Sequence, residues 1–355
     1  MIEAAVSRPL EGAEGLYERW GALRAAQPGL RAREAASALG VSEAQLLACR
    51  VGHGVIELAP DWAAILHGLP ALGEIMALTR NDHAVHEKTG GFDNVEVQPG
   101  HALVVNREID LRIFLSHWRF GFAVDEEVRS GRRHSLQFFD VDGTAVHKVY
   151  LREGSNGHAY DALVAAHRRA DACERLPVLA LPERAPDRDD EEIDIDGLRA
   201  HWAALQDTHD FVGLLREFGV GRVQALRLAG EQFAHRAPDN ALEQVLERAA
   251  ADCIPIMCFV GNAGCIQIHT GPIARLKRVG RWYNVLDEGF NLHVDTDGID
   301  SAWVVRKPTR DGDVTSLELY DRNGSCTLRL FGERKPGFTE LSAWADALHA
   351  LPPAS

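Results

Sequence analysis

An internal repeat constrains this chain more than any other feature of its sequence. Shifting the sequence against itself by 181 residues places Ile75 on Ile256 and Asn81 on Asn262. The same register, without a gap, also aligns Met76 with Met257, Thr89 with Thr270, Leu111 with Leu292, Val124 with Val305, Leu136 with Leu317, Asp140 with Asp321 and Gly143 with Gly324. Two copies of one fold are therefore expected, and positions at which the copies differ chemically become candidates for function.

Length and composition indicate an ordinary globular protein of two domains. The chain has 355 residues, of which 46% are hydrophobic and 25% are charged. No apolar run is long enough to span a membrane, and residues 1–19 lack the basic and apolar regions of a secretory signal. The formal net charge of −14 disfavours binding to nucleic acid or to an anionic membrane. We therefore expect a cytoplasmic protein without membrane insertion.

The six cysteines agree with this expectation, because they are scattered and form no C-x-x-C motif. They are predicted to be reduced core residues rather than disulfide or zinc ligands. These cysteines are Cys49, Cys173, Cys253, Cys258, Cys265 and Cys326.

Each half places helices before strands. Residues 14–51 and 195–250 have helical periodicity, whereas residues 74–151 and 255–331 alternate in polarity and are divided by turn signals. Helices followed by antiparallel strands, twice, predict an α+β fold that is internally duplicated, with a large antiparallel sheet in each repeat.

Three divisions of the chain follow from this layout. An N-terminal repeat covers residues 1–178, and a C-terminal repeat covers residues 198–355. Residues 179–197 contain an acidic stretch with prolines, which predicts a linker between the repeats.

Residues 33–47 are similar to the helix-turn-helix of DNA-binding proteins, and residues 214–228 have the same pattern. In the first copy, the second helix would begin with Ser42, Glu43 and Gln45, which offer little basic surface to contact phosphates. A helix pair packed on its own sheet is therefore the favoured interpretation, and a DNA-binding regulator is a distant alternative.

Two histidine-containing segments are candidates for metal ligation. His83 and His86 look like a metal pair, but positions three apart in a strand face opposite sides and cannot share one metal. His209 follows an Asp-Thr pair that can cap a helix over residues 210–218, and a histidine held at a helix start can be aimed at a flat apolar partner. Each of these histidines could instead be a hydrogen-bonded structural residue.

Three cations of the second half have acidic counterparts in the first half. Arg222, Lys307 and Arg334 are matched by Glu43, Glu126 and Glu153. If the cations converge, they form an anion site that only the second half can have. Met257 and Phe259 lie in an adjacent apolar strand. These features suit a flat, apolar dianion whose centre binds imidazole, and haem has this chemistry.

Six stretches of the chain resemble the bacterial cytoplasmic haem-utilisation proteins of the HemS/HmuS/ChuS type, also called haemin-degrading factors. These stretches are Arg80–Glu87, Ile109–Phe114, Asp207–Phe211, Phe259–Asn262, Arg306–Thr309 and Thr315–Leu319. The resemblance covers nearly the whole chain. It implies a pseudo-duplicated fold of large antiparallel sheets flanked by helices, with one main cleft for haem (iron protoporphyrin IX) formed mainly by the second repeat.

The resemblance also implies roles for individual residues. His209 stands at the position of the proximal iron ligand, and Arg112 stands at the distal arginine position. The implied cleft residues are Arg222, Lys307, Arg334, Phe259 and Met257. His86 stands at the position of a weaker second haem site in one branch of the family. Arg112 cannot ligate iron, but its guanidinium can donate hydrogen bonds to a bound water.

Three functions are open at this stage. The leading hypothesis is a cytoplasmic haem-binding protein of iron acquisition, which carries haem from an inner-membrane importer to a downstream haem oxygenase. The second hypothesis is an enzyme that cleaves the macrocycle with reductant and oxygen, and the third is a haem-sensing helix-turn-helix regulator. The same site geometry would serve carriage and degradation, so no catalytic residue is assigned.

Overall fold

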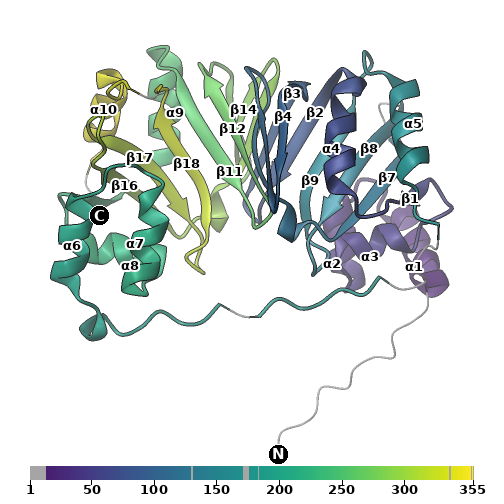
Figure 1. Ribbon diagram of the computed structural model, residues 1–355, viewed down its shortest axis with the longest axis horizontal. Helices are drawn as coiled ribbons and strands as arrows, with labels where there is room; N and C mark the ends of the chain where they lie inside the picture. The colour runs from purple at the N-terminus through teal and green to yellow at the C-terminus, as the bar shows by residue number, and fades with distance from the viewer. Residues whose placement is uncertain are drawn as a thin grey trace, which may run out of the picture. The chain divides into compact units, whose positions relative to one another are not determined.

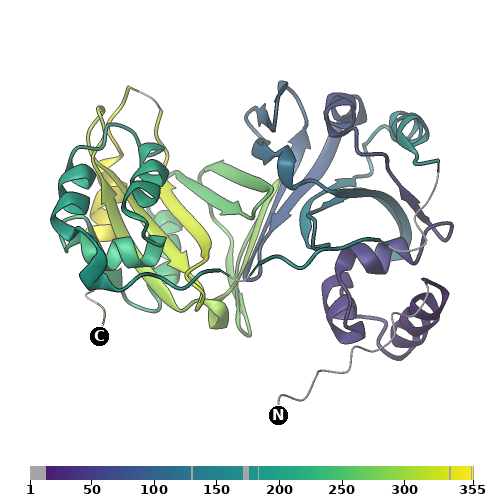
Figure 2. The ribbon, with the colours of Figure 1, turned by 60° about the horizontal axis from the view of Figure 1, so that its bottom comes forward.

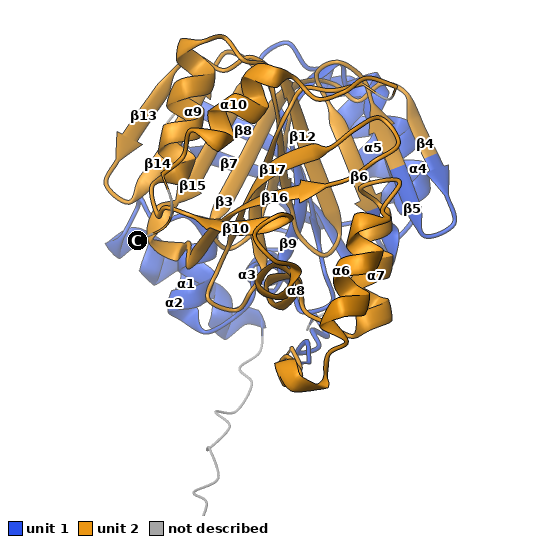
Figure 3. Ribbon diagram, turned by 90° about the vertical axis from the view of Figure 1, so that its left-hand side faces the viewer, with its two compact units in different colours: residues 1–75, 97–102, 114–182 blue, residues 76–96, 103–113, 183–355 orange. Residues whose placement is uncertain are grey.

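The computed structural model (Figure 1) describes residues 13–128, 131–170, 176–182, 184–335, 337–352 and 354. The chain divides into two compact units (Figure 3). Unit 1 comprises residues 1–75, 97–102 and 114–182, and unit 2 comprises residues 76–96, 103–113 and 183–355. The units differ from the predicted repeats, because two segments of the first repeat belong to unit 2.

The strands confirm the internal repeat. Strands β2 to β9 recur in order as β11 to β18, and each begins within two residues of the position that the shift of 181 predicts. The first set is β2 (Glu74–Arg80), β3 (Ala84–Gly91), β4 (Val95–Gln98), β5 (His101–Val105), β6 (Asp110–Phe114), β7 (Phe120–Val128), β8 (Gly131–Phe139) and β9 (Ala145–Leu151). The second set is β11 (Ile256–Gly261), β12 (Cys265–Gly271), β13 (Leu276–Val279), β14 (Trp282–Asp287), β15 (Phe290–Asp295), β16 (Ser301–Lys307), β17 (Val314–Tyr320) and β18 (Cys326–Gly332). Two short strands, β1 (Val55–Glu57) and β10 (Ala234–Ala237), complete the pattern.

Helices precede the strands in each repeat, as predicted. In the first repeat they are α1 (Ala13–Ala26), α2 (Ala32–Leu39), α3 (Glu43–Ala48) and α4 (Trp62–Gly68), with α5 (Gly157–His167) after the strands. In the second repeat they are α6 (Ile195–Ala203), α7 (Asp210–Phe218), α8 (Arg222–Ala229) and α9 (Ala241–Ala251), with α10 (Ser342–His349) after the strands. Single 3-10 turns are η1 (Leu69–Leu72), η2 (Leu115–His117), η3 (Asp190–Glu192) and η4 (Thr296–Gly298). Within the described residues, none of the helices has the length and apolar character that a membrane span requires.

The strands form two nine-stranded sheets, in the orders β1-β7-β8-β9-β2-β3-β15-β14-β13 and β10-β16-β17-β18-β11-β12-β6-β5-β4. Equivalent strands of the two repeats therefore occupy equivalent places. Within unit 2 the repeats exchange strands: β15 pairs with β3, with His293 opposite Val85, and β6 pairs with β12, with Arg112 opposite Ile266. This exchange explains why strands of the first repeat are counted in unit 2.

In unit 2, helices cover both faces of the sheet that contains β16, β17 and β18 (Figures 1 and 2). On one face, α9 and α10 pack against alternate residues such as Val304, Leu317 and Leu330. On the other face, α6, α7 and α8 pack against Trp303 and Val305. The period-two alternation of these strands thus places two cores on opposite sides of one sheet.

Neither helix-turn-helix pattern presents a free recognition helix. In unit 1, Ala44 and Leu47 of α3 pack with Phe122 and Phe139 of the sheet. In unit 2, α7 and α8 belong to the core that includes Val305. The favoured interpretation, in which each helix pair packs on its own sheet, is therefore confirmed.

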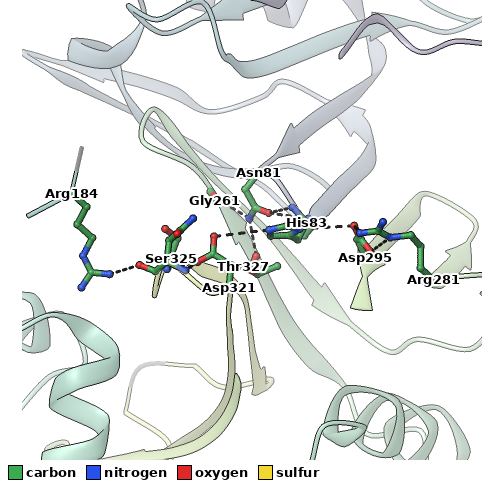
Figure 4. Close-up of polar contacts among 11 residues, drawn as sticks. Asn81, His83, Arg184, Gly261, Arg281, Asp295, Asp321, Ser325 and Thr327 are labelled. Carbon is green, nitrogen blue, oxygen red and sulfur yellow. Dashed lines mark hydrogen bonds and ion pairs between the residues drawn. The ribbon is translucent and has the colours of Figure 1, made fainter. Parts of the chain in front are cut away.

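Two asparagines join the repeats inside unit 2, and Figure 4 shows one of them, Asn81, beside Gly261. Asn81 Nδ2 donates to the carbonyl oxygen of Gly261 at 3.1 Å, and Asn262 Nδ2 donates to the carbonyl oxygen of Arg80 at 2.8 Å. These contacts are equivalent under the shift of 181. Each asparagine also accepts two backbone N–H groups of its own turn through Oδ1. In each amide, the oxygen therefore bonds to its own turn and the nitrogen bonds to the equivalent turn of the other repeat.

The segment predicted as a linker is partly docked on unit 2. Arg188 donates to the carbonyl oxygen of Glu192 at 3.0 Å, and Asp190 accepts hydrogen bonds from Gln224 at 3.0 Å and from Arg227 at 2.8 Å. Asp190 thus ties the end of this segment to Gln224 and Arg227 of α8. Helix α6 then begins at Ile195, two residues before the predicted end of the linker.

The cysteine prediction is correct for most positions. The five cysteines that the structure describes carry free thiols, and Cys173 lies outside the described residues. Cys49, Cys258 and Cys265 are buried. Cys253 is exposed, because it follows α9 in a turn with φ of 53° rather than lying in a core strand.

A cluster of basic side chains is buried near the asparagine junction. Lys88 Nζ donates to His269 Nδ1 at 3.2 Å, and the ring of His269 stacks on Phe290 with the ring centroids 3.8 Å apart. Lys88 and His269 are equivalent positions of the two repeats. Burial and Lys88 lower the pKa of His269 to about 3. Burial, His269 and Lys88 likewise hold the pKa of His86 well below its ordinary range.

Because the pKa values of His86 and His269 are lowered, we expect the protein to lose stability in acid. Below the ordinary pKa of 6.5, the unfolded chain binds a proton at each histidine that the folded chain does not bind. The free energy of unfolding should therefore fall by about 1.4 kcal/mol per pH unit for each such group as the pH drops from 6.5 towards 3. Urea unfolding at several pH values measures this slope.

His86→Gln tests the origin of the slope, since Gln267 occupies the equivalent buried position of the second repeat. This variant should be less sensitive to acid by up to about 1.4 kcal/mol per pH unit. The exposed His158 supplies the control, and His158→Gln should leave the slope unchanged. An equal slope in His86→Gln and the wild type would contradict the prediction.

Candidate functional site

Helix α7 positions His209 at its amino-terminal end. The helix spans Asp210–Phe218, as predicted, and His209 is its N-cap residue rather than a member of its first turn. Phe211 and Leu214 anchor the helix in the core of unit 2, whereas the side chain of His209 is 93% exposed. The helix is therefore held by packing while its histidine is open to a ligand.

Asp207 binds the imidazole of His209. Its Oδ1 accepts a hydrogen bond from the backbone N–H of His209 at 2.8 Å and another from Nδ1 at 2.6 Å. These two bonds lower the pKa of the Asp207 carboxyl. The N-cap is His209 rather than a residue of the Asp-Thr pair, and its side chain makes no capping hydrogen bond. With Nδ1 engaged, Nε2 is the ring nitrogen that can bind a metal.

Arg222 and Lys307 converge, but on a carboxylate. Lys307 Nζ donates to Glu318 Oε1 at 2.6 Å, and Arg222 Nη1 lies 3.5 Å from Glu318 Oε2. Both cations also lie over the ring of Phe211: Lys307 Nζ is 4.6 Å and Arg222 Cζ is 5.1 Å from its centroid. The side chain of Lys307 is only 5% exposed, so its charge is directed to Glu318 rather than to solvent.

Glu318 is the centre of a buried polar network. Ser316 Oγ donates to its Oε1 at 3.0 Å, and the Tyr320 hydroxyl donates to its Oε2. Burial alone would raise the pKa of Glu318, but Lys307 and Arg222 outweigh burial and hold this pKa well below its usual range. Glu318 therefore stays ionised at neutral pH and fixes the positions of both cations.

Arg329 is a further cation of this site. Its guanidinium lies 5.5 Å from the centroid of the Phe259 ring, and it also lowers the pKa of Glu318. Arg222, Lys307 and Arg329 thus bring three positive charges to one carboxylate. The buried network consequently has a net positive charge, which favours an anion nearby.

Arg334 lies on the side of the site that contains His209. Its Nη2 is 3.6 Å from Asp311 Oδ2, and its charge contributes to the lowered pKa of Asp207. The cations predicted from the repeat comparison therefore separate into two groups. Arg222 and Lys307 meet at Glu318, whereas Arg334 belongs with Asp207 and His209.

The strands beside this network carry an apolar, half-buried face. Ile256, Cys258 and Val260 of β11 lie in the core, so Met257 and Phe259 point to the opposite face, where both are half-buried. This alternation follows directly from the period of a β-strand.

The strand register extends this face across unit 2. Met257 lies opposite Phe331 of β18, and Phe259 lies opposite Ile268 of β12. The rings of Phe259 and Phe331 contact each other with centroids 5.2 Å apart. A flat apolar group could therefore pack on this face beside the positive network.

Arg112 is on the same face, at its far end. It lies opposite Ile266 of β12, and three strand spacings, about 14 Å, separate its strand from that of Arg329. Its guanidinium donates to Asp110, and its side chain is 37% exposed. Arg112 can thus offer hydrogen bonds at the end of the apolar face.

His86 is in a different environment. It is fully buried, and its ring contacts Phe290 with centroids 5.0 Å apart. It lies beside the backbone of Cys258, just as its counterpart Gln267 donates to the carbonyl oxygen of Ala77. The position that the resemblance implies for a weaker second haem site is thus buried, because β3 pairs with β15 of the other repeat and places His86 where the repeats meet. His83 precedes β3 and lies 3.9 and 4.0 Å from Asp295 and Asp321 (Figure 4).

The equivalent positions of the first repeat have reversed charges. Glu43, the counterpart of Arg222, accepts a hydrogen bond at 2.8 Å from Lys148, the counterpart of Arg329. Glu126 pairs with Arg133 at 2.7 Å. In unit 1 these positions therefore form neutral pairs, without the excess of cations around Glu318.

The donor set of unit 2 suits a ligand that brings its own metal. Among the residues that the structure describes, no group of three or more histidine, cysteine, aspartate or glutamate side chains could hold a metal ion. One imidazole can, however, complete the coordination of an iron that a macrocycle already holds. His209, the apolar face of Phe259 and the cations near Glu318 would bind the centre, the plane and the anionic groups of such a ligand.

Sequence reasoning missed Glu318, Arg329 and the role of Asp207. A glutamate inside the otherwise uncharged strand Val314–Tyr320 was the available signal for Glu318, since buried carboxylates need cationic partners. The repeat offers no charge difference at Arg329, because its counterpart is also basic.

Comparisons with known proteins identify the family of this chain. A family model described as the haemin-degrading HemS.ChuX domain matches residues 40–167 and again residues 219–351. The hemin transport protein HmuS of Yersinia pestis is 40% identical over 340 residues, which are 95% of this chain and 97% of that protein. The two matches to one family model reproduce the internal repeat.

Two solved structures have the same fold over nearly their whole length. Holo-PhuS, a heme-binding protein from Pseudomonas aeruginosa, superposes with a TM-score of 0.94 at 47% identity and covers 97% of this chain and 100% of its own. The heme degrading enzyme ChuS of Escherichia coli O157:H7 superposes with a TM-score of 0.90 at 36% identity and covers 96% and 100%. One of these proteins is described as heme-binding and the other as a heme degrading enzyme.

Glu318→Gln should destabilise the protein strongly. Removing the carboxylate leaves the buried Lys307 and the half-buried Arg222 without their counter-ion, and breaking a buried ion pair typically costs about 3–5 kcal/mol. Urea unfolding at neutral pH measures the change in the free energy of unfolding. Glu288→Gln, at an exposed position, is the matched control and should change it by less than about 0.5 kcal/mol. Equal effects of the two variants would show that the network does not stabilise the fold.

Proposed function

This chain belongs to the haemin-degrading HemS/ChuX family, and we propose that unit 2 binds haem with His209 as the axial ligand. The exposed, carboxylate-supported imidazole at the start of α7 is the observation that carries the proposal. Bound haem would supply an iron centre with redox and ligand-exchange chemistry. All other contributions come from the side chains of the chain.

Each part of the site has a task in this proposal. His209 provides Nε2 while Asp207 holds its Nδ1–H. Met257 and Phe259 would pack against the macrocycle, and the positive charge around Glu318 would attract the propionates. Arg222 and Arg334 are the cations for direct contact, since each has a side chain that is 20% exposed. Lys307 acts from within the network.

We propose one tight haem per chain. The first repeat carries Glu43 and Glu126 where the second carries Arg222 and Lys307, and both glutamates are already paired with cations. His86 is buried, so a second haem at this residue would require the junction of the repeats to open.

The favoured role is carriage of haem in the cytoplasm, from an inner-membrane importer to a downstream haem oxygenase, as part of iron acquisition. The side chain of His209 is accessible from solvent, which suits exchange with a donor and an acceptor. The relative HmuS is described as a hemin transport protein. Degradation is the second candidate, because the relative ChuS is described as a heme degrading enzyme.

His209→Ala tests the binding site. The wild type should give a Soret band typical of imidazole-bound haem and saturate at one haem per chain. The variant should lose that spectrum and at least about 100-fold in affinity, since the loss of even an outer partner of a metal ligand costs about 10–100-fold.

His201→Ala is the control, because His201 is a half-exposed histidine of the neighbouring helix α6 with its Nδ1 bonded to the carbonyl oxygen of Gly197. This control should bind haemin as the wild type does. Unchanged haemin binding by His209→Ala would refute the assignment.

Carriage and degradation give different spectra under reductant. We expect the Soret band of the haem complex to persist when ascorbate is added together with catalase, which removes hydrogen peroxide. Bleaching that persists with catalase, accompanied by release of iron, would instead establish degradation by the protein. Free haemin under the same conditions is the control for bleaching without the protein.

A further inference from the structure

We infer that Asp207 is a positioning residue that fixes His209 as the Nδ1-protonated tautomer and presents its bare Nε2 to the ligand. The inference rests on the proposed function only in identifying that ligand as haem iron. It assigns Asp207 a role that concerns the electronic state of the site rather than the fold.

The hydrogen bonds of the turn support this role. Oδ1 of Asp207 lies 2.6 Å from His209 Nδ1, and the same oxygen accepts the backbone N–H of His209 at 2.8 Å. The backbone N–H of Asp207 donates to Asp210 Oδ2 at 3.1 Å, and its carbonyl oxygen accepts from the backbone N–H of Asp210 at 3.1 Å. The carboxylate is therefore held within a closed turn while it holds the ring.

His209 and Asp207 are both exposed, so the hydrogen bond between them decides how the ring of His209 is oriented. The side chain of His209 is 93% exposed and that of Asp207 is 61% exposed, so packing does not determine the orientation or tautomer of the ring. A carboxylate can only accept hydrogen bonds, so the proton must be on Nδ1. Nε2 then carries the lone pair, which is the requirement for metal ligation.

The carboxylate also changes the strength of the ligand. A hydrogen bond from Nδ1–H to a carboxylate makes imidazole a stronger electron donor through its other nitrogen. A stronger axial donor favours ferric over ferrous iron. Asp207 therefore biases bound haem against reduction, which suits carriage better than reductive degradation.

The first experiment uses the haem-free protein and does not depend on the proposed function. Long-range proton–nitrogen correlation NMR of the labelled protein, at a mildly alkaline pH where an ordinary imidazole is neutral, identifies the protonated nitrogen of each histidine. The signals of His209 are assigned by their loss in His209→Ala. The wild type should show Nδ1–H, and Asp207→Ala should shift His209 towards the Nε2–H form.

Asp210→Asn is the matched control. Asp210 accepts the backbone N–H of Asp207 rather than a hydrogen bond from the ring of His209, and the amide oxygen of asparagine can still accept that N–H. The substitution therefore removes a carboxylate of the turn while it keeps the turn closed and Asp207 in place. This variant should keep the wild-type tautomer. His201 provides an internal reference, because its Nδ1 lies 3.0 Å from the carbonyl oxygen of Gly197 in all of these proteins.

The second experiment measures the haem complex. Asp207→Ala should weaken ferric haem binding about 10–100-fold and make the midpoint potential of the iron more positive, while Asp210→Asn should change neither. An Nε2–H tautomer in the wild type, or an unchanged tautomer in Asp207→Ala, would overturn the inference. If haem binds independently of His209, the proposed function fails while the tautomer of the haem-free protein still decides the role of Asp207.

Discussion

The reciprocal hydrogen bonds of Asn81 and Asn262 are the constraint on which the arrangement of unit 2 depends. Each amide closes its own turn with Oδ1 and reaches the equivalent turn of the other repeat with Nδ2. Both amides are half-buried and have their donor and acceptor ends occupied by the two turns, so these hydrogen bonds favour one register of the turns. That register sets which strands continue each sheet, and through them the pairing of β6 with β12 and of β15 with β3.

The duplicated framework has diverged at its charged positions more than in its backbone. The same strands and helix pairs recur in both repeats, yet the pair Glu43–Lys148 in one becomes the cluster of Arg222, Arg329 and Glu318 in the other. Bases at two positions, Arg222 and Lys307, where the first repeat has Glu43 and Glu126, leave positive charge in excess and favour an anion without any new element. The carboxylate of Glu318 keeps that charge compatible with burial, since unpaired buried cations are costly.

Much of this structure could be predicted from the sequence, because it depends on local patterns or on the repeat. The shift of 181 predicts every strand from β11 to β18, and the amphipathic pattern after Asp207 predicts the bounds of α7. The burial of His86 and the pairing of Lys307 with Glu318 could not be predicted in this way. Both depend on which residues from distant parts of the chain meet in space. Cations at matched positions indicate a change of function, but their partners follow only from the strand register.

Because the repeats exchange strands, a single repeat would be incomplete on its own. A polypeptide with the second repeat alone would leave β12 and β15 without the neighbours that β6 and β3 now provide, and exposed edges of this kind recruit another chain. Two identical copies could satisfy each other about a two-fold axis, with residue 88 of one copy facing its own equivalent in the other. In this chain the equivalent contact joins Lys88 to His269. Two repeats in one polypeptide thus complete each other's strand edges without a second chain, and the two halves can carry different side chains at equivalent positions.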